Sequence, residues 1–154
     1  MIKTMFDCII IGAGEAGAAA ALAAARNKIK VLVLDREARG LPAFDGEQGE
    51  SKGSSEVVAV EKNIVSFSVE TKSGKVFYGR SIIIATGKNG GELETITAKE
   101  LSGNIKVDAN MATSVEGVFA IGGCNNALDG DETVKTGEGA KAALAVAEYL
   151  KGSK

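Results

Sequence analysis

With 154 residues, the chain is expected to form one domain that spans residues 1–154. Its 18 basic and 20 acidic side chains give a net charge of −2 and are spread along the sequence, without the basic block that favours nucleic acid or an anionic membrane as a partner. The sequence contains no histidine, which excludes His-based catalytic triads, histidine metal sites and imidazole acid–base chemistry.

The first element is the apolar run DCIIIGAGEAGAAAALAAA at residues 7–25, which contains three glycines and Glu15. A membrane helix needs about 20 mostly bulky apolar residues, whereas this run is dominated by alanine and glycine. The local pattern instead predicts a buried parallel strand at 6–11, a glycine-rich turn and a helix over 18–26. A second apolar strand at 31–34 follows directly, so the segment is expected to form a βαβ unit.

The turn at residues 12–17 reads Gly-Ala-Gly-Glu-Ala-Gly and matches the pattern G-x-G-x-x-G. Gly12 allows the tight turn, Gly14 lets the backbone approach a pyrophosphate, and Gly17 lets the helix lie close to the strand. The helix N-terminus supplies N–H groups and a partial positive charge. Asp35, 23 residues after the first glycine, would accept hydrogen bonds from a ribose. The strand, the glycines, the helix, the second strand and the acid all occur in register. A dinucleotide site is therefore favoured over a turn without a ligand.

The remainder of the chain indicates which dinucleotide would bind. Residues 36–55 are polar and rich in glycine, contain the only proline, and are expected to form a turn and then a flexible loop. A three-stranded meander follows, with ETKSGK as its second turn, and such a meander does not continue a plain NAD-binding Rossmann array. The expected later elements are strands at 56–60, 64–70, 75–78, 81–85 and 118–121 and an amphipathic helix over 137–150.

This order of features resembles the FAD-binding domain of the thioredoxin reductase-like, or pyridine nucleotide–disulfide oxidoreductase, flavoproteins. The resemblance rests on the glycine motif, the acid, the meander, ATG at 85–87, TSVEGVFAIGG at 113–123 and the terminal helix, and it covers most of the chain. It implies a Rossmann-like α/β fold, in which a parallel sheet with helices carries the three-stranded β-meander. It also implies FAD as the cofactor.

The resemblance further implies which residues contact FAD. The ATG strand end would pack near the pyrophosphate and ribityl chain, and the 113–123 segment would bring its last strand to the flavin. The terminal helix would direct its N-terminus, near 133–137, at the flavin ring, where a partial positive charge stabilises the reduced form. The expected cofactor-binding residues are Gly12, Ala13, Gly14, Glu15, Ala16, Gly17, Asp35, Arg36, Val58, Ala85, Thr86, Gly87, Gly122, Gly123, Thr133 and Val134.

Three departures from the family pattern restrict the activity that the resemblance implies. Only 25 residues, 88–112, separate the two motifs, too few for the family's inserted NAD(P)H domain. The redox CxxC is missing, which excludes the usual thiol–disulfide exchange. The family's terminal Gly-Asp, whose carboxylate holds a ribityl hydroxyl, is replaced by Gly122-Gly123-Cys124, which implies weaker FAD binding.

The two cysteines form no zinc pattern, and no metal site is expected. Cys8 is expected to be a small core residue, because it lies in an apolar strand. For Cys124, beside the expected flavin, two alternatives stay open: a packed or solvent-facing thiol, or a thiol that approaches the ring. The segment after Asp35 is short, so the third parallel strand is expected to be absent. The resulting sheet edge would favour a homodimer.

These observations predict an FAD-dependent redox protein that takes electrons from a redox partner protein or a diffusible donor, with the flavin carrying the chemistry. The alternative is a non-catalytic FAD-binding module or a subunit of a larger redox complex. Neither nucleic acid nor a membrane is expected as a partner. A cytoplasmic location is expected, because Asp7 lies where the apolar segment of a signal peptide would begin.

Overall fold

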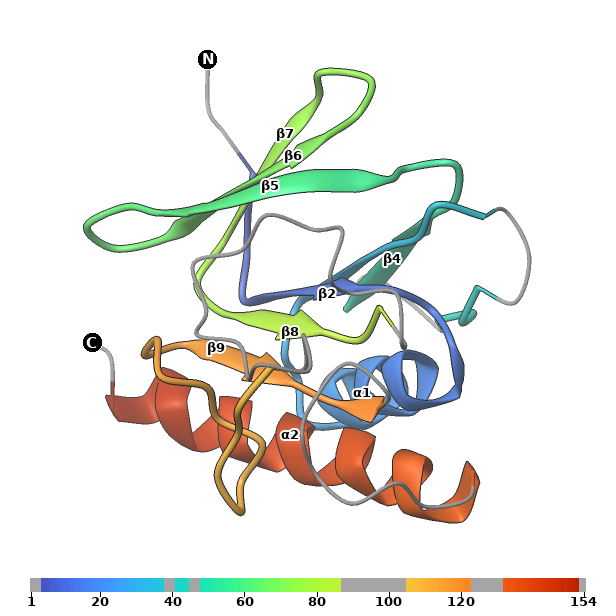
Figure 1. The fold of residues 1–154 in the computed structure, drawn as a ribbon, viewed down its shortest axis with the longest axis vertical. Helices are drawn as coiled ribbons and strands as arrows, with labels where there is room; N and C mark the ends of the chain where they lie inside the picture. Colours follow the sequence, from blue (N-terminus) through green and yellow to red (C-terminus); the bar gives the residue numbers. More distant parts are fainter. Residues whose placement is uncertain (1–3, 38–40, 45–47, 87–104, 123–131, 153–154) are drawn as a thin grey trace.

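The computed structural model describes residues 4–37, 41–44, 48–86, 105–122 and 132–152, with only the backbone described for 132–136. Its central sheet has five parallel strands in the order β4-β3-β2-β8-β9 (Figure 1). The strands are β2 (Cys8–Ile11), β3 (Val31–Leu34), β4 (Gly49–Lys52), β8 (Ile82–Ile84) and β9 (Val118–Ala120).

Helices cover one face of this sheet and a second sheet covers the other (Figure 1). The helices are α1 (Glu15–Arg26) and α2 (Glu132–Gly152), which pack against each other. The second sheet has the order β1-β7-β6-β5. Its strands are β1 (Met5–Phe6), β5 (Val57–Lys62), β6 (Phe67–Thr71) and β7 (Val76–Gly79). Strands β5, β6 and β7 form the expected antiparallel meander, and β1 joins β7 in parallel.

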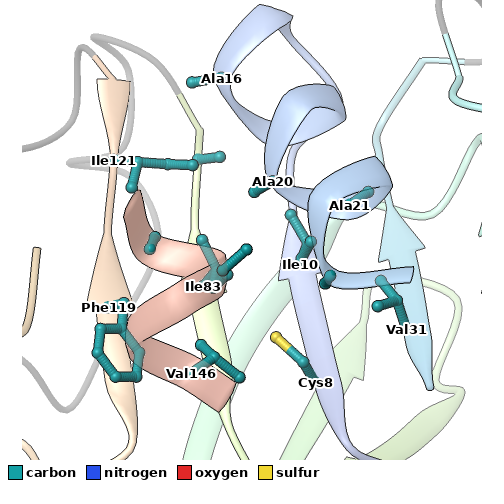
Figure 2. Packing of buried hydrophobic residues seen from close by; sticks show 14 of the residues in the cluster. Cys8, Ile10, Ala16, Ala20, Ala21, Val31, Ile83, Phe119, Ile121 and Val146 are labelled. Atoms are coloured by element: carbon teal, nitrogen blue, oxygen red, sulfur yellow. The ribbon is translucent and has the colours of Figure 1, made fainter. Parts of the chain in front are cut away.

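The central sheet is buried on both faces because its strands β2, β3, β8 and β9 are apolar at every position. In β2, Cys8 and Ile10 point to the helices, whereas Ile9 and Ile11 point to the second sheet. Figure 2 shows the helical side, where small alanines of α1 let the helix lie close to the strands. The parallel sheet with helices and meander therefore confirms the expected Rossmann-like α/β class.

The prediction of a flexible loop over 36–55 and of a missing third strand is wrong for residues 49–52. These residues form β4, which pairs in parallel with β3 from Val31 to Leu34. The pairing continues beyond the strands, since Asp35 N donates to the Lys52 carbonyl at 3.1 Å and Ser55 N donates to the Asp35 carbonyl at 2.7 Å. The edge expected beside β3 is therefore covered, and the argument for a dimer loses that premise.

Several further boundaries differ from the sequence-based expectation. Both helices begin earlier than expected, α1 at Glu15 rather than at residue 18 and α2 at Glu132 rather than at residue 137. The strand expected at 6–11 is divided at Asp7, where the chain passes from the second sheet into the central one. The strand expected at 64–70 begins only at Phe67, and the side chains of Ile64 and Val65 are 99% and 80% exposed in the turn before it. Within the described ranges, neither helix has the combination of length and apolar character that a membrane span requires.

Candidate functional site

The site lies where the strand order of the central sheet reverses. From β2 the chain continues to β3 and β4 on one side, whereas β8 and β9 lie on the other side. Ligands of open α/β sheets bind outside the carboxyl ends of the strands at such a switch point. The residues that directly follow these ends are Gly12, Asp35, Ala85 and, after Ile121, Gly122. Residues from four distant parts of the sequence are thus brought to one edge.

Gly12 and Gly17 form the tight contact between the turn, α1 and β8. Gly12 has a φ of +106°, and a Cβ placed on it would overlap the carbonyl oxygen of Ala85. A Cβ on Gly17 would overlap the carbonyl oxygen of Gly12. The turn and the close approach expected of these two glycines are present, while their contact with a cofactor stays a prediction.

Gly14 differs from the other two glycines because it faces open space. It is the N-cap of α1, with φ −69° and ψ −172°, and as a glycine it supplies no side-chain cap of its own. A Cβ placed on Gly14 would have no atom of the described residues within 4 Å. The backbone N–H groups of a first helical turn have no partner within the helix. The open space therefore lies at a helix end suited to a phosphate group.

Asp35 connects the glycine-rich turn to the end of β3 through a hydrogen bond. Its Oδ1 accepts a hydrogen bond from Ala13 N at 2.9 Å, and its Oδ2 accepts one from Glu37 N at 2.9 Å. A carboxylate oxygen has a second acceptor position, so a ribose hydroxyl can still be bound. The sequence suggested the ribose role, whereas the bond to the turn appears only in the structure.

Thr86 contributes a buried hydroxyl that has no partner among the described residues. Its Oγ1 is inaccessible to solvent and has no hydrogen-bond partner within the described part of the chain. Its backbone N would lie 3.2 Å from a Cβ on Gly12, so Thr86 lies directly beside the glycine turn. Buried polar groups nearly always have a partner. The orphaned hydroxyl and the open space at Gly14 therefore fit a bound polar ligand such as a dinucleotide.

The remaining expected residues are distributed as follows. Glu15 is exposed and Ala16 is buried in the first turn of α1, and Arg36 is exposed beside Asp35. Val58 lies in β5 of the second sheet, 37% exposed, and is not among the strand ends of the central sheet. Gly87 and Gly123 lie outside the described residues, and only the backbone of Thr133 and Val134, in the first turn of α2, is described.

Sequence reasoning missed Glu138 of α2. Its Oε1 accepts a hydrogen bond from Gly122 N at 2.8 Å, which connects α2 to the end of β9. The sequence offered one signal, the acid between two glycines in Gly137-Glu138-Gly139 near the start of the last helix.

Cys8 is a core residue, as expected. Its thiol is fully buried, and desolvation by burial raises its pKa to about 12, opposed by a hydrogen bond with Ser81. A thiolate is the reactive form of cysteine, so the buried Cys8 is not suited to redox chemistry near neutral pH. Cys124 lies outside the described residues, and its two alternatives stay open.

Comparison with known proteins relates the chain to pyridine nucleotide-disulphide oxidoreductases and thioredoxin reductases. The family model described as pyridine nucleotide-disulphide oxidoreductase matches residues 50–148, and the one described as glucose inhibited division protein A matches residues 7–48. Thioredoxin reductase from Peptoclostridium litorale is 30% identical in an alignment 160 residues long, gaps included. The alignment covers 83% of this chain and 50% of that protein. Thioredoxin reductase from Peptoclostridium acidaminophilum is 27% identical over 160 residues, which again cover 83% of this chain and 50% of that protein.

Solved structures show the same fold at low sequence identity. A thioredoxin reductase from Gloeobacter violaceus has a TM-score of 0.79 at 16% identity, and the match covers 99% of this chain and 97% of that chain. One from Streptococcus pyogenes MGAS5005 has a TM-score of 0.80 at 16% identity, covering 98% and 100%. The chain spans about half the length of the curated thioredoxin reductases that it matches.

The family assignment agrees with the geometry of the switch point. The glycine turn, the open helix end and the orphaned hydroxyl are features that a dinucleotide would complete. The cofactor of this family is FAD. Because the family model matches residues 50–148, well over half of the sequence, this chain belongs to the pyridine nucleotide-disulphide oxidoreductase family.

Proposed function

We propose that this chain is an electron-transfer flavoprotein that resembles the flavin half of thioredoxin reductase. It receives electrons from a separate donor and passes them to a redox partner protein. The observation that carries the proposal is the site at the strand ends, where an open helix N-terminus at Gly14 lies beside Asp35 and the orphaned hydroxyl of Thr86. These groups are supplied by a chain half as long as its curated relatives.

In this proposal the residues of the chain bind and orient the cofactor. Gly14 and the first turn of α1 hold the pyrophosphate, Asp35 accepts a hydrogen bond from the ribose, and the Thr86 hydroxyl donates to a cofactor oxygen. When bound, FAD supplies the electron- or hydride-transfer chemistry. The fold excludes water from the face of the sheet below the site, since the strands there are fully buried.

Disulfide reduction is not part of the proposed activity of the isolated chain. The sequence contains no CxxC, and the segment between the two motifs is too short for an NAD(P)H domain. The thiol of Cys8 is buried and protonated near neutral pH. The chain alone is therefore expected not to reduce thioredoxin or other disulfides with NADPH.

A second candidate function is a non-catalytic FAD-binding module or a subunit of a larger redox complex. The observation that favours it is the matched length, about half of each curated thioredoxin reductase. The two candidates share the FAD site and differ only in turnover.

The absorption spectrum of the purified protein, before and after incubation with FAD, tests both candidates. Anaerobic addition of NADH, NADPH or dithionite, followed by a one-electron acceptor, then measures turnover. A flavin that is reduced and reoxidised supports the electron-transfer protein, and a bound flavin that takes part in no transfer supports the module. Protein that binds no FAD, or that efficiently reduces disulfides with NADPH, contradicts the proposal.

We also propose a homodimer and a cytoplasmic location. The support for the dimer is that, in the described part of the chain, the central sheet ends at β4, and two-fold pairing is the commonest form of assembly. The Glu50–Lys52 ion pair of 3.0 Å places charges on that edge strand, and an interface must accommodate them. The support for the location is that Cys8 is a free thiol. Light scattering and cell fractionation are the respective tests.

A further inference from the structure

Glu138 connects three elements around the cofactor site. Its Oε1 accepts the hydrogen bond from Gly122 N at 2.8 Å, and Gly122 lies just beyond the carboxyl end of β9. A Cβ on Gly122 would lie 3.4 Å from the Cβ of Ala16, which belongs to the first turn of α1. The carboxylate of α2 thus holds a backbone segment that lies between the end of β9 and the helix that begins at the glycine-rich turn.

The close approach of α2 to α1 determines how far Glu138 reaches into this region. A Cβ on Gly139 would lie 2.5 Å from the carbonyl oxygen of Ala16 and 2.9 Å from the backbone N of Ala20. Only glycine fits there, so the backbone of α2 lies directly on α1. Glu138, the preceding residue, is consequently half-buried and directed to Gly122 rather than to solvent.

This carboxylate lies beside the motif in which the chain differs from the family pattern. The terminal motif of the chain reads Gly122-Gly123, without an acid of its own. Glu138 brings a carboxylate to the first of these glycines from 16 residues away. A hydrogen bond to a carboxylate is about twice as strong as one between neutral groups, and it restrains the backbone more firmly.

We propose that Glu138 is a positioning residue for FAD, which fixes the backbone at Gly122 so that the end of β9 meets the cofactor. The inference rests on the proposed function, because it requires FAD at the strand ends of the central sheet. The inference concerns Glu138 alone among the acids of α2. Glu148, on the same helix, is exposed and pairs with Lys151 at 3.5 Å, so it provides a comparison.

The test compares Glu138→Ala and Glu138→Gln with Glu148→Ala as the matched control on the same helix. Glu148 has a side chain that is 79% exposed, so its loss leaves the site unchanged. FAD affinity is measured by flavin fluorescence titration, the surroundings of bound flavin by visible circular dichroism, and the fold by thermal unfolding of FAD-free protein.

Glu138→Ala is expected to weaken FAD binding by up to about tenfold to a hundredfold, because the intramolecular bond that fixes Gly122 N is lost and FAD binding must then order this segment itself. Its flavin dichroism is expected to differ from that of the parent. Glu138→Gln retains an acceptor oxygen, so it is expected to recover part of the affinity and to remain about threefold to tenfold weaker than the parent. Glu148→Ala is expected to bind as the parent does.

Parent-like affinity and dichroism in Glu138→Ala would overturn the inference, and so would a lower unfolding temperature with unchanged affinity. If Glu138→Ala does not fold, Glu138→Gln decides: a folded protein with parent-like affinity and dichroism also overturns it. A parent protein that binds no FAD contradicts the proposed function instead. The two failures are therefore distinguishable.

Discussion

Substitution of Gly14 with valine is expected to separate cofactor binding from folding. Gly14 has extended backbone angles that any residue can adopt, and within the described part of the chain a Cβ there would have no atom within 4 Å. The FAD-free protein should therefore accept the larger side chain. The expected cost is about 1 kcal/mol of the free energy of unfolding, because an apolar residue is a poorer N-cap than glycine.

The loss in FAD affinity should be much larger. The valine side chain occupies the open space at the N-terminus of α1, where the pyrophosphate is expected to approach the backbone N–H groups. Each hydrogen bond to a charged group contributes about 1.5–3 kcal/mol. Loss of two such bonds costs about 3–6 kcal/mol, which is about a hundredfold to ten-thousandfold in the dissociation constant at about 1.4 kcal/mol per decade.

The assay is an FAD titration read by flavin fluorescence, combined with urea unfolding of the FAD-free protein. Gly17→Val is the contrasting variant, because a Cβ there would overlap the carbonyl oxygen of Gly12. It should destabilise the FAD-free protein by about 1–3 kcal/mol or more, through overpacking against backbone. A folded Gly14→Val protein that binds FAD as tightly as the parent would refute the assignment of this turn to the pyrophosphate.

Three further predictions concern the strand ends and the core. Asp35→Asn should weaken FAD binding by about tenfold in a titration, because the ribose hydroxyl loses a charged acceptor and the bond from Ala13 N that orients this side chain is weakened; unchanged affinity would argue against the ribose role. Thr86→Val removes a buried hydroxyl that has no partner among the described residues, so it should raise the free energy of unfolding of the FAD-free protein by about 1 kcal/mol. It should also lower FAD affinity, because the cofactor loses the donor proposed for it. A loss of stability in urea would indicate a partner within the chain. Because burial raises the pKa of Cys8 from 9.0 to about 12, the folded state favours the neutral thiol, so its contribution to stability is complete below pH 9 and is lost as the pH rises toward 12. Thermal unfolding of the parent and Cys8→Ala between pH 8 and 11 should therefore converge with rising pH, and a difference independent of pH would contradict this assignment.

Local patterns in the sequence determined the βαβ unit and the type of cofactor. Strand β2, the glycine turn and α1 are neighbours in sequence, so their apolar spacing and glycine spacing were sufficient to predict the unit that the structure contains. The meander was predicted for the same reason, since each hairpin joins adjacent strands.

The tertiary structure alone decided β4 and the division of the first strand. The residues of β4, Gly-Glu-Ser-Lys, have no apolar alternation, and they form a strand only because β3 offers them a row of backbone partners. Asp7 lies within an apolar run, yet its carboxylate accepts a hydrogen bond from Lys30 N at 2.9 Å where the chain changes sheets.

The same distinction applies to the candidate site. The glycine turn and Asp35 were recognisable because their spacing along the chain is characteristic of dinucleotide sites. The bond from Ala13 to Asp35, the orphaned hydroxyl of Thr86 and the carboxylate of Glu138 were decided only by the tertiary structure. They depend on contacts between segments that are far apart in sequence, and local periodicity contains no information on which distant backbone a polar side chain will meet.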